Sequence, residues 1–170
     1  METIKIVVFS TLAAIIYGIL HDQVTAHLCV EYFTIAHPPV FPTDSPFLLA
    51  IGWGIIATWW VGLPLGIGLA LAARVGKWPK LTFAEVRRSI IILMLVCAVA
   101  AIILGGVGAT LLASGAIALA PPWDQLISHD RHVAFMADAW AHLASYGFGL
   151  LGGLIVIGRT MWRRRRATVA

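Results

Sequence analysis

Residues 89–120, SIIILMLVCAVAAIILGGVGATLLASGAIALA, contain no charged side chain. This run exceeds the roughly 20 apolar residues that an α-helix needs to cross a bilayer. The rest of the chain agrees, because 60% of its 170 residues are hydrophobic and only 12% are charged. A soluble domain carries roughly twice that fraction of charge. The sequence therefore predicts an all-α integral membrane protein.

Four apolar stretches divide the chain, which we interpret as a single transmembrane domain over residues 1–170. The predicted spans cover about residues 4–35, 46–74, 83–120 and 129–162. Pro46 suits the first turn of a helix, and Pro64 is expected to kink the second span. Thr82 and Glu85 have the spacing of a capping box at the start of the third span. These signals favour a four-helix bundle.

The basic residues gather on one side of the predicted spans. They are Lys5, Arg74, Lys77, Lys80, Arg87, Arg88, Arg159 and Arg163 to Arg166. Arg131 alone lies on the other side. Cytoplasmic loops carry the excess of lysine and arginine, so we predict a multi-pass protein of the cell (inner or plasma) membrane. Both termini are then cytoplasmic, and the long helices extend beyond the outer leaflet.

The arginine run at the C-terminal end is predicted to bind anionic lipid headgroups through Arg163, Arg164, Arg165 and Arg166. Basic residues beside apolar spans also account for the net charge of +4. We therefore expect no nucleic-acid partner, while a hydrophobic small molecule remains a candidate ligand.

All six histidines fall on the predicted outer side: His21, His27, His37, His129, His132 and His142. Most acids lie there too. Counted along straight helices from the inner boundary, His21 lies about 24 Å up the first span and His142 about 26 Å up the fourth. We therefore predict that the first and fourth spans are neighbours and bring polar side chains to the same depth.

The spacing of the polar residues adds an angular argument. His27 and Glu31 are four residues apart, as are Asp138 and His142, so each pair shares a helix face. Imidazole and carboxylate groups on facing helices can converge on metal ions. We predict that one or two divalent ions, chosen among zinc, iron, manganese and copper, are bound by His27, Glu31, Asp138 and His142.

A second tier of reserve ligands, or of groups that orient the ligands, comprises His21, Asp22, His37 and His132. Asp22 lies almost opposite the face of His27 and is expected to meet the second or third span instead. The face that carries Asp138 and His142 continues through Ser145 and Gly149, and its small residues suit close helix packing in lipid.

Three classes of function fit this pattern. In the first, the metal site acts on a lipid-soluble substrate as an oxidoreductase or a hydrolase, although the sequence does not establish catalysis. The second is a metal or proton transporter or relay, against which the inner half of the spans offers almost no charge. The third is an accessory subunit of a membrane complex, with the polar cluster as a structural network.

One short stretch, His27-Leu28-Cys29-Val30-Glu31-Tyr32-Phe33, is similar to the helical His-x-x-x-Glu segment of the emopamil-binding sterol isomerases. The resemblance implies that His27 and Glu31 transfer protons at a sterol double bond. It covers seven residues, and the family's other acids and its asparagine-tryptophan pair have no counterpart here. A sterol-isomerase-like enzyme is thus an alternative to the metal site.

Overall fold

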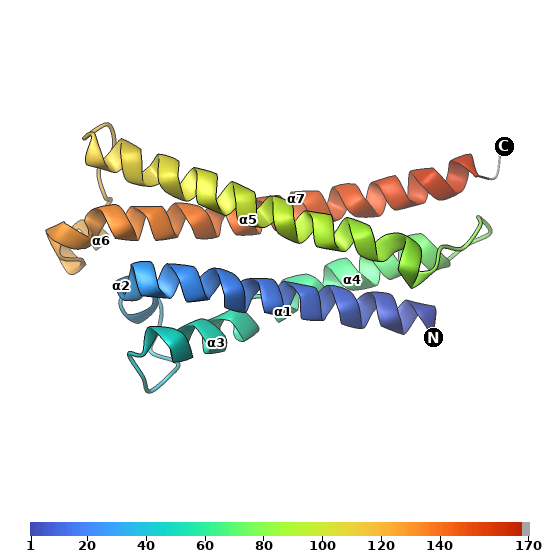
Figure 1. Ribbon diagram of the computed structural model, residues 1–170, viewed down its shortest axis with the longest axis horizontal. Coiled ribbons are helices and arrows are strands. Elements are labelled where there is room, and N and C mark those ends of the chain that lie inside the picture. Colours follow the sequence, from blue (N-terminus) through green and yellow to red (C-terminus); the bar gives the residue numbers. More distant parts are fainter. Residues whose placement is uncertain (168–170) are drawn as a thin grey trace.

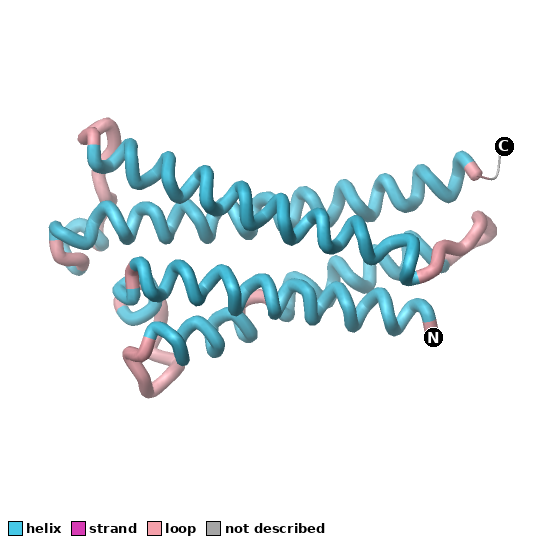
Figure 2. The backbone as a smooth tube through the Cα atoms, in the orientation of Figure 1, coloured by secondary structure: helices cyan, strands magenta, loops and turns pink. Residues whose placement is uncertain are grey.

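The computed structural model describes residues 1–167 and contains helices and loops, with no strand in that range (Figure 2). The helices are α1 (Glu2–Leu28), α2 (Val30–Thr34), α3 (Pro46–Ile56), α4 (Trp59–Arg74), α5 (Phe83–Ala113), α6 (Trp123–Leu126), η1 (His129–Arg131) and α7 (His132–Arg166). Four spans, namely α1, α3 with α4, α5, and η1 with α7, are long and apolar enough to cross a membrane. The all-α class and the four apolar spans are thereby confirmed.

The four spans run side by side along the long axis of the molecule (Figure 1). The N-terminus, the loop between α4 and α5 and the end of α7 lie together, and we call this the arginine end after Arg74 and Arg163–Arg166. The loops around α2 and α6, with His37 and His129, form the opposite, histidine end. Which side of a membrane each end faces stays a prediction.

The contacts between the spans close into a ring. α5 packs along α7, α7 contacts α4, α4 and α3 pack on α1, and α1 contacts α5. α1 and α7 thus lie across the centre from each other, with little backbone contact between them. The two spans touch through side chains in the half of the molecule nearer the histidine end, which we call the histidine half, rather than along their whole length.

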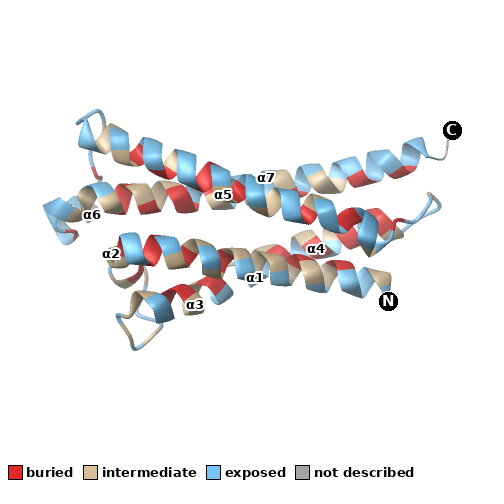
Figure 3. Ribbon diagram, in the orientation of Figure 1, coloured by how far each residue is buried: buried red, intermediate tan, exposed pale blue. Residues whose placement is uncertain are grey.

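Exposed positions follow the outward faces of the spans (pale blue in Figure 3), and large apolar residues occupy many of them. On α1, the row Leu12, Ile16, Leu20 and Val24 recurs every four residues, and each side chain is at least half exposed. In water a surface of this kind would be a liability. In a bilayer, lipid tails would solvate it, so the exposed rows agree with helices that are apolar enough to cross a membrane.

α1 ends earlier than the predicted first span. It stops at Leu28, Cys29 has an extended backbone (φ −149°, ψ 86°), and the separate short helix α2 follows. No glycine or proline marks this break. The side chain of Arg131 accounts for it, since its Nη2 donates to the carbonyl of Leu28 at 2.8 Å. The side chain of Arg131, 103 residues further along the chain, thus takes the place of the backbone N–H that would bond the Leu28 carbonyl if the helix continued.

The second span is interrupted between α3 and α4 at Ala57 and Thr58, whereas Pro64, the expected kink, lies inside α4. The interruption lies where α3 crosses α1. Thr58 Oγ1 donates to the carbonyl of Gly54 at 2.5 Å, and such bonding back to the preceding turn bends helices. Gly54 itself lies against the backbone of α1, so the crossing needs a residue without a side chain.

We expect Gly54→Ala to destabilise this crossing, because its Cβ would lie 2.5 Å from Ile19 N and 2.6 Å from Ile19 Cα. Backbone must then shift, at a cost of about 1–3 kcal/mol. Gly106→Ala on α5 is the control, since its Cβ would meet nothing within 4 Å and should gain up to about 1 kcal/mol of helix propensity. Denaturant titration in detergent measures both, and equal effects would contradict the close crossing.

The third span begins as predicted and ends earlier than expected. The capping box of Thr82 and Glu85 is present, with Glu85 Oε2 accepting from the backbone N–H of Thr82 at 2.9 Å. α5 stops at Ala113 rather than near residue 120. Gly115 has a φ of +73°, and the N–H of Ala116 donates to the carbonyl of Leu111 at 3.0 Å. A glycine in the left-handed conformation ends the helix in this way.

At the arginine end, hydrogen bonds from Arg164 connect α7 to the end of α4 and to the loop after it. Its guanidinium donates to the carbonyls of Pro79 (2.7 Å), Val75 (3.0 Å), Trp78 (3.0 Å) and Ala72, and only 1% of the residue is exposed. The other arginines of the run differ from it. Arg163 pairs with Glu85 at 3.0 Å, and Arg165 and Arg166 are exposed. Binding of headgroups by this run stays a prediction.

Candidate functional site

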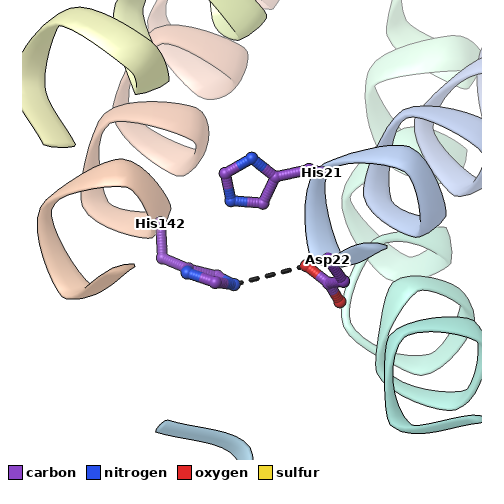
Figure 4. A group of neighbouring side chains, drawn as sticks. All are labelled: His21, Asp22 and His142. Atoms are coloured by element: carbon purple, nitrogen blue, oxygen red, sulfur yellow. Dashed lines mark ion pairs between the residues drawn. The ribbon is translucent and has the colours of Figure 1, made fainter. Parts of the chain in front are cut away.

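The centre of the histidine half holds a group of three side chains from two spans. α1 contributes the successive residues His21 and Asp22, and α7 contributes His142 (Figure 4). Asp22 Oδ1 lies 3.3 Å from His142 Nε2, and the rings of His21 and His142 meet edge to face with centroids 4.6 Å apart. One ligand atom of each residue lies within 4.8 Å of the other two. Asp22 therefore contacts α7, a partner that its place opposite the His27 face did not predict.

Asp138 lies one turn before His142 on α7 and is fully buried. Its Oδ1 lies 2.7 Å from His142 Nδ1, while the same nitrogen donates its hydrogen bond to the backbone carbonyl of Asp138 at 3.0 Å. Neither carboxylate oxygen has an aligned hydrogen-bond donor among residues 1–167. Asp138 thus holds the ring with Nδ1 against its own helix, so Nε2 points across to α1.

His21 presents a buried nitrogen, Nε2, that has no hydrogen-bond partner in the described chain. Its ring stacks on Tyr17 at 5.7 Å with an interplanar angle of 17°. The Tyr17 hydroxyl shares a 2.7 Å hydrogen bond with Ser145 of α7. Buried ring nitrogens are normally satisfied, so the free Nε2 indicates a position for a further group.

Aromatic side chains close the site toward the histidine end. Tyr32 of α2 stacks on His142 with centroids 4.5 Å apart, and Phe33 meets the same ring at 5.7 Å. His37, a second-tier candidate, donates from Nδ1 to the carbonyl of Tyr32 at 2.7 Å. The short helix after the break at Cys29 therefore acts as a cover over His142.

The remaining predicted ligands lie outside this group. His27 is exposed, with Nδ1 2.7 Å from the carbonyl of Gln23. Glu31 accepts from Arg131 at 3.0 and 3.2 Å, and His132 contacts the carbonyl of Ile127 at 2.9 Å. Of the four principal candidates, the structure brings Asp138 and His142 together and joins them to the second-tier residues His21 and Asp22. This arrangement does not test whether a metal ion is bound by His27, Glu31, Asp138 and His142.

Tyr17 and Tyr32 were absent from the sequence prediction. Tyr17 lies four residues before His21, on the same helix face, and that spacing is a signal that could have found it. Tyr32 gives no such signal, because its place over His142 depends on the break at Cys29. The position of Tyr32 is thus a tertiary property.

The ion pair between Glu31 and Arg131 ties α2 to the start of the fourth span. Burial alone would raise the pKa of Glu31, but the hydrogen bonds from Arg131, from its own backbone N–H and from the Cys29 thiol, with the charge of Arg131, together outweigh burial and hold the pKa below its ordinary value of 4.5. The neighbouring Cys29 thiol donates to the same carboxylate at 3.3 Å. Burial, followed by that carboxylate, raises the pKa of Cys29 to about 12, so the thiol stays neutral over the physiological range.

The lowered pKa of Glu31 predicts an acid-sensitive contact. A carboxylate with a lowered folded-state pKa stabilises the fold above its unfolded pKa, and the effect is lost as pH falls through the folded value. We expect wild type to lose about 0.5–1 kcal/mol relative to Glu31→Gln between about pH 6 and about pH 3. Unfolding titrations at several pH values measure this, and parallel curves for the two proteins would contradict it.

A cavity of about 130 Å³ runs from the polar group along the centre of the four spans. At the histidine end its wall includes His21, Asp22 and His142, and at the arginine end it includes Leu69, Ile90 and Val156. The polar group therefore lies at one end of a mainly apolar cavity. An arrangement of this kind, with a few polar groups in an apolar pocket, is typical of small-molecule sites.

The stretch that resembles the sterol isomerases is not one helix in this protein, because the break at Cys29 places His27 in α1 and Glu31 in α2. The two side chains have different partners, and neither belongs to the central group. Comparison of the whole chain with protein-family models, with curated proteins and with solved structures finds no match.

Proposed function

We propose that this chain is a membrane metalloprotein whose divalent ion is bound by His21, Asp22 and His142. The separation of the ligand atoms carries the proposal. Bonds of about 2.0–2.1 Å at a tetrahedral angle place two zinc ligands about 3.3 Å apart. His142 Nε2 and Asp22 Oδ1 lie 3.3 Å apart, longer than the about 2.7–2.9 Å of a charge-assisted hydrogen bond.

The surroundings of the two histidines support the same assignment. A histidine that binds a metal through one nitrogen almost always presents the other to a carboxylate or a carbonyl. His142 has both partners at Nδ1, from Asp138. The unpartnered Nε2 of His21 supplies the third ligand atom. Asp138 is then a positioning residue, and a metal would satisfy the buried Nε2 of His21, which has no hydrogen-bond partner among residues 1–167.

The donor set limits the chemistry. Two imidazoles and one carboxylate occur in catalytic zinc sites and in non-haem iron(II) oxygenases, both of which keep a position open for water or substrate. The cavity begins at these three residues, so the open position faces an apolar space. We therefore propose a hydrolase or an oxidoreductase that acts on a lipid-soluble substrate.

A metal-free proton relay is the second candidate, favoured by the place of His142 between the carboxylates of Asp22 and Asp138. An imidazolium in this position would pair with both acids. Polar groups inside membranes often serve such relays. The relay needs no ion, so metal content separates the two candidates.

Metal analysis of the detergent-purified protein tests the proposal. We expect wild type to hold about one ion per chain, as a site of this type does, and His142→Gln and Asp22→Asn to hold almost none. His27→Gln and His132→Gln are matched controls that remove a histidine outside the group and should keep the ion. Metal-free wild type, or equal loss in the controls, would contradict the assignment.

A further inference from the structure

The cavity beyond the polar group is long and narrow. Along α7 its wall extends from His142 to Val156, a rise of about 21 Å, and along α1 from Asp22 to Ser10, about 18 Å. The volume is about 130 Å³, which is small for a space of this length. One hydrocarbon chain suits a small volume of this length better than fused rings do.

The chemistry of the wall changes once along this length. Beyond Ser145 the wall is mainly apolar and includes Leu65, Leu69, Ile90, Leu93, Met94 and Val156. Ser10 also lies there, but its hydroxyl already donates to the carbonyl of Ile6 at 2.8 Å. Apolar cavities stay dry and accept apolar ligands. A polar molecule would find hydrogen-bonding partners mainly at the histidine end.

Gly149 keeps the middle of the cavity open. It follows His142 and Ser145 on the same face of α7 and lines the cavity. A Cβ at this position would meet only Cys97 Sγ, at 3.8 Å, which is an ordinary contact. The glycine was expected to serve helix packing, yet here its missing side chain leaves space.

We propose that the cavity binds a molecule with one linear hydrocarbon tail and a small oxygen-bearing head, of the fatty acid, fatty alcohol or fatty aldehyde class. The head lies at His21, Asp22 and His142, and the tail extends past Gly149 toward Leu69 and Val156. This inference rests on the proposed function for the chemistry of the head. The fit of the tail depends on the cavity alone.

Photolabelling with lauric acid that carries a diazirine at its terminal carbon tests this placement. We expect the label on the arginine-end wall, at Leu69, Leu93 or Val156. Unlabelled lauric acid and lauryl alcohol should compete, while cholesterol, a fused-ring lipid, should not. Label confined to lipid-facing residues such as Leu143 and Leu150, or competition by cholesterol alone, would overturn the proposal.

A substitution that fills the cavity gives a second test. Gly149→Phe should lower labelling about tenfold or more, because overfilling a packed site costs about 1–3 kcal/mol. Gly158→Phe is the control, since a Cβ there meets nothing within 4 Å and the residue is exposed. Equal labelling of the two variants would contradict the tail position. If Gly149→Phe does not fold, the competition experiment with wild type still decides.

The two proposals can fail separately. Gly149→Phe should keep its metal, because the residue touches none of the three ligands, and His142→Gln should keep the labelled tail wall. If wild type holds no metal but keeps the specific labelling, the proposed metal site is wrong and the proposed tail site stands. If wild type holds the metal but shows no specific labelling, the proposed tail site is wrong and the proposed metal site stands.

Discussion

Arg164→Ala should be the most destabilising single substitution at the arginine end, at about 3 kcal/mol or more. The guanidinium donates to the carbonyls of Ala72, Val75, Trp78 and Pro79. A buried acceptor left without its donor costs about 1–3 kcal/mol, and several lose their partner at once. Its positive charge also lies at the C-terminal end of α4, where a helix dipole favours a cation.

The controls lie beside it in the sequence. Arg165→Ala removes an exposed arginine, and Arg163→Ala removes an exposed ion pair with Glu85 of about 0–1 kcal/mol. Denaturant titration in detergent micelles compares the three proteins. If Arg164→Ala loses no more stability than Arg165→Ala, the hydrogen bonds of Arg164 do not stabilise the fold. The four arginines would then act only through their charge, as a site for lipid headgroups would.

Asp138→Asn should weaken metal binding by about 10–100-fold, the usual effect of losing a carboxylate behind a metal-bound histidine. This corresponds to about 1.4–2.8 kcal/mol. The amide keeps the size of the side chain and the backbone carbonyl that accepts from His142 Nδ1, but it removes the carboxylate charge 2.7 Å from that nitrogen. The dissociation constant, measured by competition with a chelator dye, gives the effect directly.

Glu31→Gln is the matched control, because Glu31 is a half-buried acid that the sequence predicts as a ligand and that pairs with Arg131 instead. Its dissociation constant for the metal should equal that of wild type. A larger loss in Glu31→Gln than in Asp138→Asn would favour the ligand set predicted from the sequence. Unchanged binding in Asp138→Asn would remove its positioning role.

The spans and the depth of the site could be predicted from local patterns. Apolar length locates the four spans, and the capping box of Thr82 and Glu85 depends on residues three apart. Counting the rise per residue placed His21 and His142 at nearly the same height, and their rings are in contact. Height along a helix needs only the sequence.

The facing residues could not be predicted in the same way. His27 and Glu31 were assigned to one face of a continuous helix, but the hydrogen bond from Arg131 to Leu28 ends that helix between them. The rotation of α1 is set by its close contacts with Gly54, Gly62 and Gly66 of the second span. These contacts turn His21 and Asp22 toward α7, and no local spacing encodes them.

The burial of Arg164 illustrates the same limit. In the sequence it is one of four identical residues, and its neighbours Arg163 and Arg165 are exposed. Only the position of the loop after α4 distinguishes it. A tertiary contact thus gives one member of a uniform run a separate role.

X-ray absorption at the edge of the bound metal tests the central proposal most directly. The account predicts only nitrogen and oxygen ligands at about 2.0–2.2 Å, with imidazole scattering that weakens in His21→Gln and in His142→Gln but not in His27→Gln. A sulfur ligand at about 2.3 Å, or a spectrum unchanged by both His21→Gln and His142→Gln, would contradict a metal held by His21, Asp22 and His142.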